Sequence, residues 1–472
     1  MPFADLRQYV DRLESAGQLK RIRKEVDWNL ELSHVAKVNE EVGGGVALLF
    51  ENVKDYPGIP VLTSLLGNKQ RVALALDMPI ESKALDIGRE WVARLARGKI
   101  PPEYVSSAPC KANIVKGDKI DLFKFPAPQF YPRDGGRYIG TACFLINRNI
   151  DTGRVNLGTY RSMIYDEKRA GVQLLKGKDA EVDLRGYAQR REPMPVALVI
   201  GADPVLFLCS STLFGQDESE YDAAGALRGE PVKVVRGETV DLPIPATAEV
   251  VIEGEIVPGE LLDEGPFGEY TGYYSGKGRV PREFIQVKAV TYRDNPIFWA
   301  TTVGKPVTDT HMIQSINRAA ALWDGLEGVK IPGIKGVYCP PAAGGRFVAI
   351  VSVKQQYPGH ATHAGLASFS TVMGNYGLKT VIVVDDDIDP ENMDQVMFAL
   401  GLRFQPDRGA QILHRGRSTP LDPSLEIANR DMTSRILIDA TIPYEWKEKP
   451  IPIELDPDMA RKVRSQWSQY FE

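Results

Sequence analysis

Two glutamates flank a tight turn in the segment Glu264-Gly265-Pro266-Phe267-Gly268-Glu269, which continues to Tyr274. The glycines and the proline allow a sharp bend that would bring both carboxylates toward one point. Carboxylates that are buried or held close together have raised pKa values, and one of them can then act as a general acid near neutral pH. An exposed acidic loop is the ordinary alternative, but a solvated loop does not need this rigidity. The segment is therefore the first candidate for proton transfer.

A second candidate is Arg161, which ends the segment Asn156-Leu157-Gly158-Thr159-Tyr160-Arg161 after the hairpin turn Asp151-Thr152-Gly153. An arginine inside a β-barrel offers a planar fork for a substrate carboxylate or a catalytic glutamate, although a surface position is commoner. Strict strand alternation places Asn156 and Arg161 on opposite faces. Both can serve one site only if a bulge near Gly158, or a site that spans the strand edge, resolves this conflict.

The remaining polar residues limit the chemistry further. Glu220 is a candidate ligand for a hard cation, or a carboxylate that simply stabilises a helix N-terminus. Asp385-Asp386-Asp387 suggests Mg²⁺, but a solvated loop fits better because successive side chains point in different directions. The 4 cysteines form no CxxC pair, and among the 5 histidines only His360 and His363 are close. Any chemistry must therefore rest on carboxylates, arginine or a bound cofactor.

Composition excludes several classes of protein. The 472 residues carry a net charge of -5, and 43% are hydrophobic, as in an ordinary globular chain of about three domains. A pI near 5.8 gives no overall basic surface for nucleic acid, and no apolar run is long enough for a membrane span. The first residues do not match a secretory signal peptide, and unpaired cysteines suit a reducing compartment. We expect a cytoplasmic protein without nucleic-acid or membrane partners.

The hydrophobic pattern predicts three parts. Residues 1–120 are mixed α/β, with helices over Phe3–Leu13 and Ala84–Leu95 and short strands at Ala47–Phe50 and Val61–Leu62. Residues 121–310 are rich in strands with irregular connections, typical of a barrel. Residues 311–472 return to α/β, with a helix that Asp389 caps and Pro390 opens, and a last helix near Met459–Trp467. The strands expected in the barrel are Ala142–Ile146, Leu157–Tyr165, Val196–Ile200, Val205–Leu208, Val250–Ile252, Ile285–Val290 and Ile297–Thr301.

These segments resemble the UbiD family of decarboxylases that use prenylated FMN, and the spacing is most similar to the branch acting on hydroxylated aromatic acids. The resemblance covers nearly the whole chain, and the Glu264–Tyr274 motif is its most specific part. It implies an α/β protein with a central split β-barrel, similar to flavin reductases, for the flavin, between N-terminal and C-terminal α/β domains; the last domain would mediate oligomerisation. The other matching segments are Phe3–Arg7, Ala47–Val53, Pro195–Pro204, Glu218–Gly229, Val383–Pro390 and Ile436–Thr441.

By this resemblance Arg161, Glu264 and Glu269 match the family's catalytic network. Glu269 would deliver a proton to the ring carbon that loses CO₂, Arg161 would orient the substrate carboxylate, and Glu264 would hold Arg161. The resemblance also implies a divalent cation, Mn²⁺ or Mg²⁺, with K⁺ as a further ion, that bridges the protein to the flavin phosphate. Its implied ligands are Asn156 and Glu220, and weaker candidates for phosphate or metal-site contacts are Ser210, Ser211 and Lys379.

One departure from the family pattern concerns this cation. At the family's spacing from Arg161, a metal-ligating histidine is expected, but the chain has Lys178 there. A protonated lysine has no lone pair to donate. Lys178 could replace the cation and neutralise the phosphate and Glu220 directly, Asp179 could serve as a hard ligand if the loop shifts by one residue, or the site could have lost the flavin.

The resemblance implies reversible, non-oxidative decarboxylation of an aromatic, phenolic acid. A close alternative is a subunit of a multi-component carboxylase resembling phenylphosphate carboxylase, for which Lys176 and Lys178 would suit a phosphate. A third hypothesis is a non-catalytic partner with a decayed metal site. The expected partners are a small aromatic acid or a phenol with CO₂, a flavin prenyltransferase that supplies the cofactor, and other subunits in a homo-oligomer or hetero-oligomer.

Overall fold

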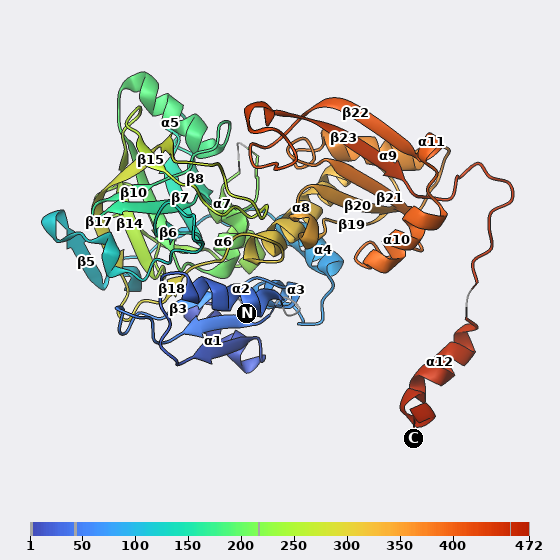
Figure 1. The fold of residues 1–472 in the computed structure, drawn as a ribbon, viewed down its shortest axis with the longest axis horizontal. Coiled ribbons are helices and arrows are strands. Elements are labelled where there is room, and N and C mark those ends of the chain that lie inside the picture. The colour runs from blue at the N-terminus through green and yellow to red at the C-terminus, as the bar shows by residue number, and fades with distance from the viewer. Residues whose placement is uncertain (1–2, 42–44, 216–217, 454, 472) are drawn as a thin grey trace.

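A small sheet packed with helices forms the first part of the computed structural model, which describes residues 3–41, 45–215, 218–453 and 455–471 (Figure 1). Helix α1 (Leu6–Ser15) begins at Asp5, whose side chain accepts a hydrogen bond from the amide of Gln8, and it buries one apolar face. Strands β1 (Leu19–Ile22), β2 (Ala47–Phe50) and β3 (Val61–Thr63) follow. The accompanying helices are α2 (Glu31–Glu41), α3 (Lys69–Ala75) and α4 (Ala84–Leu95).

The middle part is a nine-stranded antiparallel sheet in the order β6-β9-β10-β17-β14-β11-β7-β8, with β5 added beside β17. Although β6 and β8 lie at opposite ends of this order, two short connections join the ends. Thr141-Ala142 links β6 to β7, and Thr159-Tyr160-Arg161 links β8 to β9. The sheet must therefore curl into a barrel that is split between β8 and β6. The strands are β5 (Asn113–Lys116), β6 (Tyr138–Gly140), β7 (Cys143–Arg148), β8 (Val155–Gly158), β9 (Ser162–Asp166), β10 (Arg169–Gly171), β11 (Met194–Ile200), β14 (Val250–Ile256) and β17 (Phe284–Tyr292).

Three helices and two small sheets surround the barrel. The helices are α5 (Asp179–Arg190), α6 (Pro204–Ser210) and α7 (Glu220–Arg228). One small sheet is the hairpin β15 (Leu262–Glu264) and β16 (Val280–Arg282), and it ends at the first glutamate of the acidic turn. The other sheet joins β4 (Glu103–Tyr104), β12 (Lys233–Arg236) and β13 (Pro243–Pro245).

The C-terminal part is a five-stranded sheet whose three central strands are parallel. Helix α8 (Asp309–Gly328) lies between this sheet and the barrel in Figure 1, and most of its residues are buried. Helix α12 (Pro457–Ser465) extends away from the rest of the molecule. The remaining elements are β19 (Ile334–Tyr338), β20 (Val348–Val353), α9 (His360–Ser370), β21 (Thr380–Asp385), α10 (Met393–Leu402), α11 (Pro406–Gly409), β22 (Ala410–Arg417) and β23 (Met432–Asp439).

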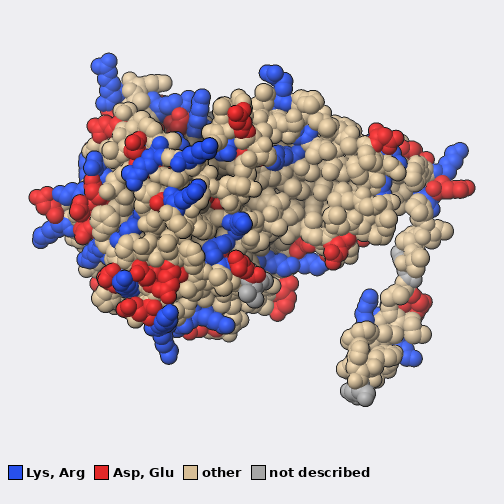
Figure 2. Space-filling view, viewed as in Figure 1, with Lys and Arg blue, Asp and Glu red and all other residues tan. Residues whose placement is uncertain are grey.

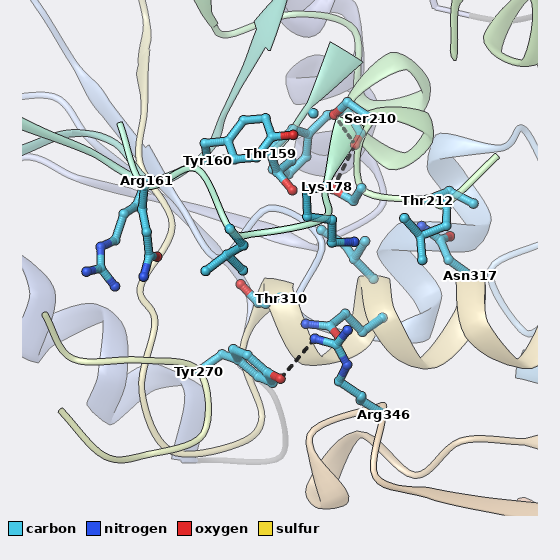
Figure 3. Close-up of a pocket in the computed structure, with 18 of the residues that line it drawn as sticks. Thr159, Tyr160, Arg161, Lys178, Ser210, Thr212, Tyr270, Thr310, Asn317 and Arg346 are labelled. Carbon is cyan, nitrogen blue, oxygen red and sulfur yellow. Dashed lines mark hydrogen bonds between the residues drawn. The ribbon is translucent and has the colours of Figure 1, made fainter. Parts of the chain in front are cut away.

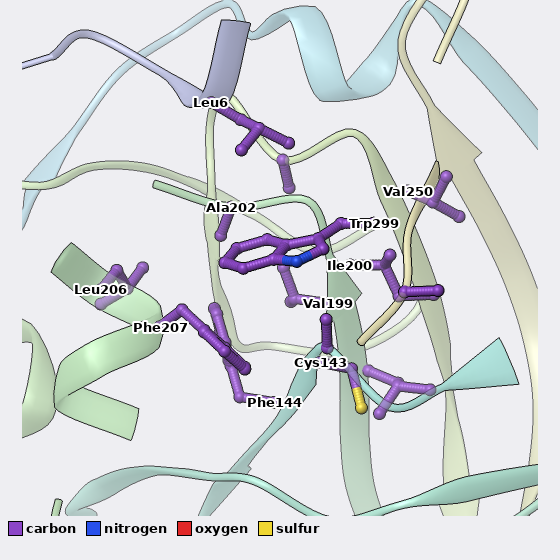
Figure 4. Close-up of a cluster of buried hydrophobic side chains, with 14 of the residues drawn as sticks. Leu6, Cys143, Phe144, Val199, Ile200, Ala202, Leu206, Phe207, Val250 and Trp299 are labelled. Carbon is purple, nitrogen blue, oxygen red and sulfur yellow. The ribbon is translucent and has the colours of Figure 1, made fainter. Parts of the chain in front are cut away.

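A buried tryptophan joins the first part to the barrel (Figure 4). Trp299 belongs to β18 (Phe298–Trp299), which pairs in parallel with β3. Its ring centroid lies 4.7 Å from that of Phe207 on α6, and Leu6 of α1 lies in the same cluster. The strand predicted at Ile297–Thr301 thus exists in shortened form, but its assignment to the barrel was wrong. The domain boundaries after residues 120 and 310 stay predictions.

Three other predicted elements differ from the structure. Val205–Leu208 is helical in α6, because Asp203 caps the helix, Pro204 occupies its first turn, and a short fully buried apolar run has no periodicity to distinguish helix from strand. Helix α10 begins at Met393, where Asn392 rather than Asp389 accepts the cap hydrogen bonds; Asp389 pairs with Lys83. The strand predicted at Leu157–Tyr165 is broken between β8 and β9.

Acidic and basic side chains are interspersed on the face shown in Figure 2. No helix in the described part of the chain is long and apolar enough to cross a membrane. Within the acidic run after β21, Asp385 and Asp387 form ion pairs with Arg403, so this loop is held by arginine.

Candidate active site

Arg161 lies in the short connection across the split of the barrel. The chain leaves β8 after Gly158 and enters β9 at Ser162, so strand alternation does not apply between Asn156 and Arg161. A side chain at position 158 would collide with the ring of Tyr160, at 2.5 Å from the position of a Cβ atom. The break resolves the conflict that alternation raised, because Asn156 and Arg161 both line one cavity.

The acidic turn carries both glutamates to this arginine. Glu264 ends β15, and Gly265 has φ of 87°, a conformation that glycine adopts without strain. Arg161 donates from Nε to Glu264 Oε1 at 2.9 Å and from Nη2 to Oε2 at 2.8 Å, a two-pronged ion pair. Its Nη1 donates to Glu269 Oε1. The three side chains that the sequence singled out are therefore brought together.

Burial decides the electrostatics of this trio. The exposed fractions of the side chains are 6% for Arg161, 1% for Glu264 and 8% for Glu269. Burial raises the pKa of Glu269, and the neighbouring carboxylate of Glu264 raises it further, while Arg161 opposes both effects. Burial alone would lower the pKa of Arg161, but the two carboxylates raise it, so the arginine stays charged. Glu269 is thus the group in this trio that is poised to carry a proton.

Further side chains hold the trio in place. Tyr138 donates its hydroxyl to Glu264 Oε1 at 2.9 Å, and the guanidinium of Arg161 lies 4.9 Å from the ring centroid of Phe267. Asp134 accepts hydrogen bonds from the amides of Gly268 and Tyr131, both at 2.9 Å, and so fixes the acidic turn. Sequence reasoning missed the roles of Tyr138 and Asp134, because neither belongs to a motif and both are far from residues 264–269 in the chain.

The cavity has two chemically different ends (Figure 3). We call Arg161, Glu264 and Glu269 the acid end, and Lys178, Arg318 and Arg346 the cationic end. Figure 3 shows Arg161 on one side of the cavity and both Lys178 and Arg346 on the other. Tyr270 connects the ends, because it follows Glu269 in sequence and its hydroxyl accepts a hydrogen bond from Arg346 Nη1 at 3.2 Å. The cavity has a volume of about 240 Å³.

The cationic end was only partly predicted. Lys178 precedes α5, and its Nζ lies 5.5 Å from the ring centroid of Tyr376. Burial and the nearby Arg346 and Arg318 lower the pKa of Lys178 to about 7. Arg318 and Arg346 were not singled out, since they come from α8 and the C-terminal part and have no motif around them. Lys176 is exposed and does not line the cavity.

Comparison with known proteins now identifies the family. Models of the 3-octaprenyl-4-hydroxybenzoate carboxy-lyase match in three parts: its N-terminal domain over residues 10–91, its Rift-related domain over 103–306 and its C-terminal domain over 311–440. Phenolic acid decarboxylase of Bacillus subtilis (strain 168) is 34% identical over 449 residues, which cover 94% of this chain and 93% of that protein. The chain belongs to the UbiD family. It is a carboxy-lyase of the UbiD type, as the sequence predicted.

Solved structures confirm the expected fold. Vanillic acid decarboxylase of Sedimentibacter hydroxybenzoicus in its closed form is 31% identical, with a TM-score of 0.88 and 100% of both chains covered. An evolved dimeric form of the UbiD-class enzyme HmfF from Pelotomaculum thermopropionicum, in complex with prFMN, is 31% identical, with a TM-score of 0.82 over 96% of this chain and 99% of that one. The split barrel between two α/β parts is therefore the UbiD fold.

The oxygen donors beside the acid end fit a hard cation in this UbiD-family chain. Asn156 donates its Nδ2 to Asn147 Oδ1 at 2.8 Å, which leaves its own Oδ1 as an acceptor. Glu220 accepts the amide of Leu157 at Oε2, and Asp179 is the first residue of α5. All three side chains line the cavity. The described residues contain no metal-binding group of three His, Cys, Asp or Glu side chains, so the amide of Asn156 is needed as the third donor.

Arg154, and not Lys178, is the cation that pairs with these carboxylates. Its Nη2 lies 3.3 Å from Asp179 Oδ2 and 3.7 Å from Glu220 Oε1. The hypothesis that Lys178 neutralises Glu220 directly is therefore wrong in this structure, because Lys178 is turned toward Tyr376 and the arginines. Asp179, one residue after the expected histidine position, supplies an oxygen donor there.

The weaker cofactor candidates separate into two groups. Ser210 and Ser211 line the cavity at the end of α6, and both hydroxyls donate to the carbonyl of Phe207, at 2.8 and 3.1 Å. Lys379 lies outside the cavity lining and binds Asp422 at 3.1 Å and Ser424 at 2.9 Å. A carboxylate of the C-terminal part pairs with its charge here, and its role as a cofactor contact stays a prediction.

Proposed function

We propose that this UbiD-type carboxy-lyase removes CO₂ from a phenolic aromatic acid, and that it runs in reverse when CO₂ and the phenol are abundant. The observation that carries this proposal is the buried trio of Arg161, Glu264 and Glu269 at one end of a cavity. Two relatives support the substrate class, since their names specify phenolic acid and vanillic acid. The same proton-transfer group serves both directions.

Each residue of the acid end has a distinct proposed role. Glu269 carries the proton that replaces the departing carboxylate on the ring carbon, and burial, which raises its pKa, favours the protonated form. Arg161 has more N–H donors than the three hydrogen bonds that the glutamates accept, and those left over orient the substrate carboxylate. Glu264 is a positioning residue, since it fixes the guanidinium plane.

Prenylated FMN is the proposed cofactor, and when bound it supplies the electron sink for the substrate ring. The proposed cation ligands are Asn156, Asp179 and Glu220, all through oxygen, so Mg²⁺ or Mn²⁺ suits the site better than a soft metal. Ser210 and Ser211, which line the same cavity, are the proposed contacts to the flavin phosphate. A flavin prenyltransferase is the proposed source of the cofactor.

We also propose a cytoplasmic oligomer. All four cysteines are free and buried, which suits a reducing compartment. The proposed oligomerisation element is the C-terminal part, whose helix α10 exposes Met393, Met397 and Leu402. A homo-oligomer is the first expectation, and a hetero-oligomer with other carboxylase subunits is the alternative.

The test is expression together with a flavin prenyltransferase, followed by absorbance spectra, metal analysis and assay with phenolic acids. We expect a coloured protein with a bound divalent metal that releases CO₂ from hydroxylated benzoates. A colourless, flavin-free chain would contradict the proposal and favour a non-catalytic subunit. Bound flavin without turnover would point to a missing partner subunit, which co-purification from the native host would identify.

A further inference from the structure

The cationic end gathers three basic side chains from three separate elements. Lys178 precedes α5, Arg318 lies on α8, and Arg346 follows the turn after β19. The two arginines are only 8% and 7% exposed, yet both line the cavity. The barrel part, helix α8 and the C-terminal part each contribute one basic side chain to the same cavity. This arrangement is expected of a binding site rather than of a surface patch.

These two buried arginines have no carboxylate partner among the ion pairs of the described residues. Arg318 Nε contacts Gln314 Oε1 at 3.4 Å, and Arg346 Nη1 donates to the hydroxyl of Tyr270 at 3.2 Å. The guanidinium of Arg346 also lies 4.9 Å from the ring centroid of Tyr376, and its Nε has no hydrogen-bond partner. Buried charges are normally paired, because removing an ion from water without compensation is costly. Burial and Arg346 lower the pKa of Arg318 to about 9, which shows the same lack of compensation.

The position of this charge favours an anionic group of the substrate over the flavin phosphate. The oxygen donors Asn156, Asp179 and Glu220 supply a place for a cation that would hold a phosphate, and Lys178 adjoins Asp179, whereas the two arginines come from α8 and the C-terminal part. The cationic end, in contrast, is joined to the acid end by one residue, since Tyr270 follows Glu269 and binds Arg346. A flat ring in the cavity can therefore meet Arg161 with one substituent and the arginines with another.

We propose that the cationic end binds a second carboxylate on the substrate ring, so that this enzyme prefers aromatic dicarboxylic acids and removes one of their two carboxyl groups. Guanidinium forks match a carboxylate in plane and in spacing, which favours a carboxylate over a single phenol hydroxyl. This inference rests on the proposed function and narrows its substrate class. At the acid end the bond between ring carbon and carboxylate breaks, CO₂ leaves, and a proton from Glu269 takes its place. The second carboxylate stays on the product, and water restores the proton on Glu269.

The test compares matched acids on the flavin-loaded enzyme. Hydroxyisophthalate and hydroxyterephthalate are assayed against hydroxybenzoate, and we expect kcat/KM to be at least about 10-fold higher for the diacids, since a charged hydrogen bond contributes about 1.5–3 kcal/mol. Arg318→Gln and Arg346→Gln should each lower kcat/KM for the diacids about 10-fold to 100-fold. Both variants should lower kcat/KM for the diacids more than for hydroxybenzoate, and both should keep the wild-type flavin content.

Controls separate the possible sources of an effect. Arg403→Gln alters a C-terminal arginine that pairs with Asp385 and Asp387, and we expect no change with any substrate. Lys178→Met provides a third probe of the cationic end if an arginine variant fails to fold. Equal kcat/KM for monoacids and diacids in the wild type would overturn the inference while leaving the proposed function intact.

Two further outcomes would also overturn it. Loss of flavin from both arginine variants would assign the cationic end to the cofactor phosphate. Turnover of an aryl phosphate with CO₂, in preference to the diacids, would assign it to a phosphorylated phenol. A wild-type protein that binds no flavin and releases no CO₂ from any acid would overturn the proposed function as well, and the spectrum distinguishes that failure from the others.

Discussion

The two ends of the cavity hold buried arginines in opposite surroundings. Arg161 contacts two glutamates and donates two hydrogen bonds to one of them, Glu264. Arg318 and Arg346 are buried to a similar degree, but their neighbours are an amide, a hydroxyl, an aromatic ring and each other. The positive charge is thus balanced by carboxylates at the acid end, whereas no carboxylate of the described residues pairs with the two arginines of the cationic end.

This difference indicates that the acid end carries out the proton transfer and that the cationic end binds an anionic group of a ligand. A compensated network is rigid and preorganised, so it can position a proton donor before the substrate arrives. An uncompensated pair of charges lowers the stability of the ligand-free protein and recovers that free energy when an anion binds.

The largest expected effect follows from Glu269→Gln at the acid end. The amide keeps the size of the side chain but cannot deliver the proton, so we expect kcat to fall by about 100-fold or more. Isotope exchange at the ring carbon should fall with it, while the protein stays folded and keeps its flavin. The matched control is Glu260→Gln, an exposed glutamate that accepts a hydrogen bond from Gln286. Wild-type exchange in the Glu269 variant would remove this residue from the acid role.

Arg161→Met should cause the largest loss of stability. It leaves two buried carboxylates without their cation, and breaking a buried ion pair in this way costs about 3–5 kcal/mol. The free energy of unfolding, measured in denaturant at pH 7, should fall by this amount. At pH 5 the loss should be smaller, because the unpaired carboxylates can take up protons there. A variant as stable as the wild type would show that the acid end is not a compensated network.

Arg318→Met should have the opposite sign in the same measurement. Replacing an unpaired buried charge by an apolar side chain of similar length removes a desolvation cost, so the ligand-free protein should be unchanged or more stable by about 1–2 kcal/mol. Destabilisation comparable to that of Arg161→Met would mean that Arg318 has an anionic partner in solution, and the contrast between the two ends would not hold.

A pH-dependent effect is expected at Asp134, which supports the acidic turn. Burial raises the pKa of Asp134 to about 6, although hydrogen bonds from the amides of Tyr131 and Gly268 oppose this shift. Because the folded-state pKa is above that of the unfolded chain, the contribution to stability is complete below about pH 4 and is lost as pH rises through 6. The Asp134→Asn variant should therefore lose less stability than the wild type between pH 4 and 7, by on the order of 2 kcal/mol. Parallel pH profiles would contradict this.

The sequence was most informative where function depends on a local motif. Glu264 and Glu269 are separated by a turn whose residues dictate its geometry, and Arg161 could be recognised together with them by family resemblance. The curled barrel was predicted from its irregular strands, yet Val205–Leu208 was assigned to a strand because burial on all sides gives helix and strand the same apolar pattern. Local chemistry was thus easier to predict than the type of a short buried element.

Residues that act through tertiary contacts could not be predicted in the same way. Arg318 and Arg346 meet only because α8 packs between the barrel and the C-terminal sheet, and no pattern in the chain encodes that encounter. The pairing of Lys379 with Asp422, more than forty residues away in the chain, could not be read from a local pattern either. The sequence also could not show which of two adjacent residues joins the oxygen donors. In the structure Asp179 lines the cavity with Asn156 and Glu220, and the Nζ of Lys178 lies near Tyr376.

The three-residue link Thr159-Tyr160-Arg161 has a consequence for how this enzyme can change over evolution. The link closes the barrel and also carries the arginine of the acid end, so an insertion or deletion there would disturb folding and chemistry together. Arg318 and Arg346 lie on α8 and the C-terminal part, outside that constraint. By the proposed role of the cationic end, substrate range can change through substitutions in residues 309–440 while the link and its reaction stay the same, and a graft of that segment from a relative would transfer selectivity.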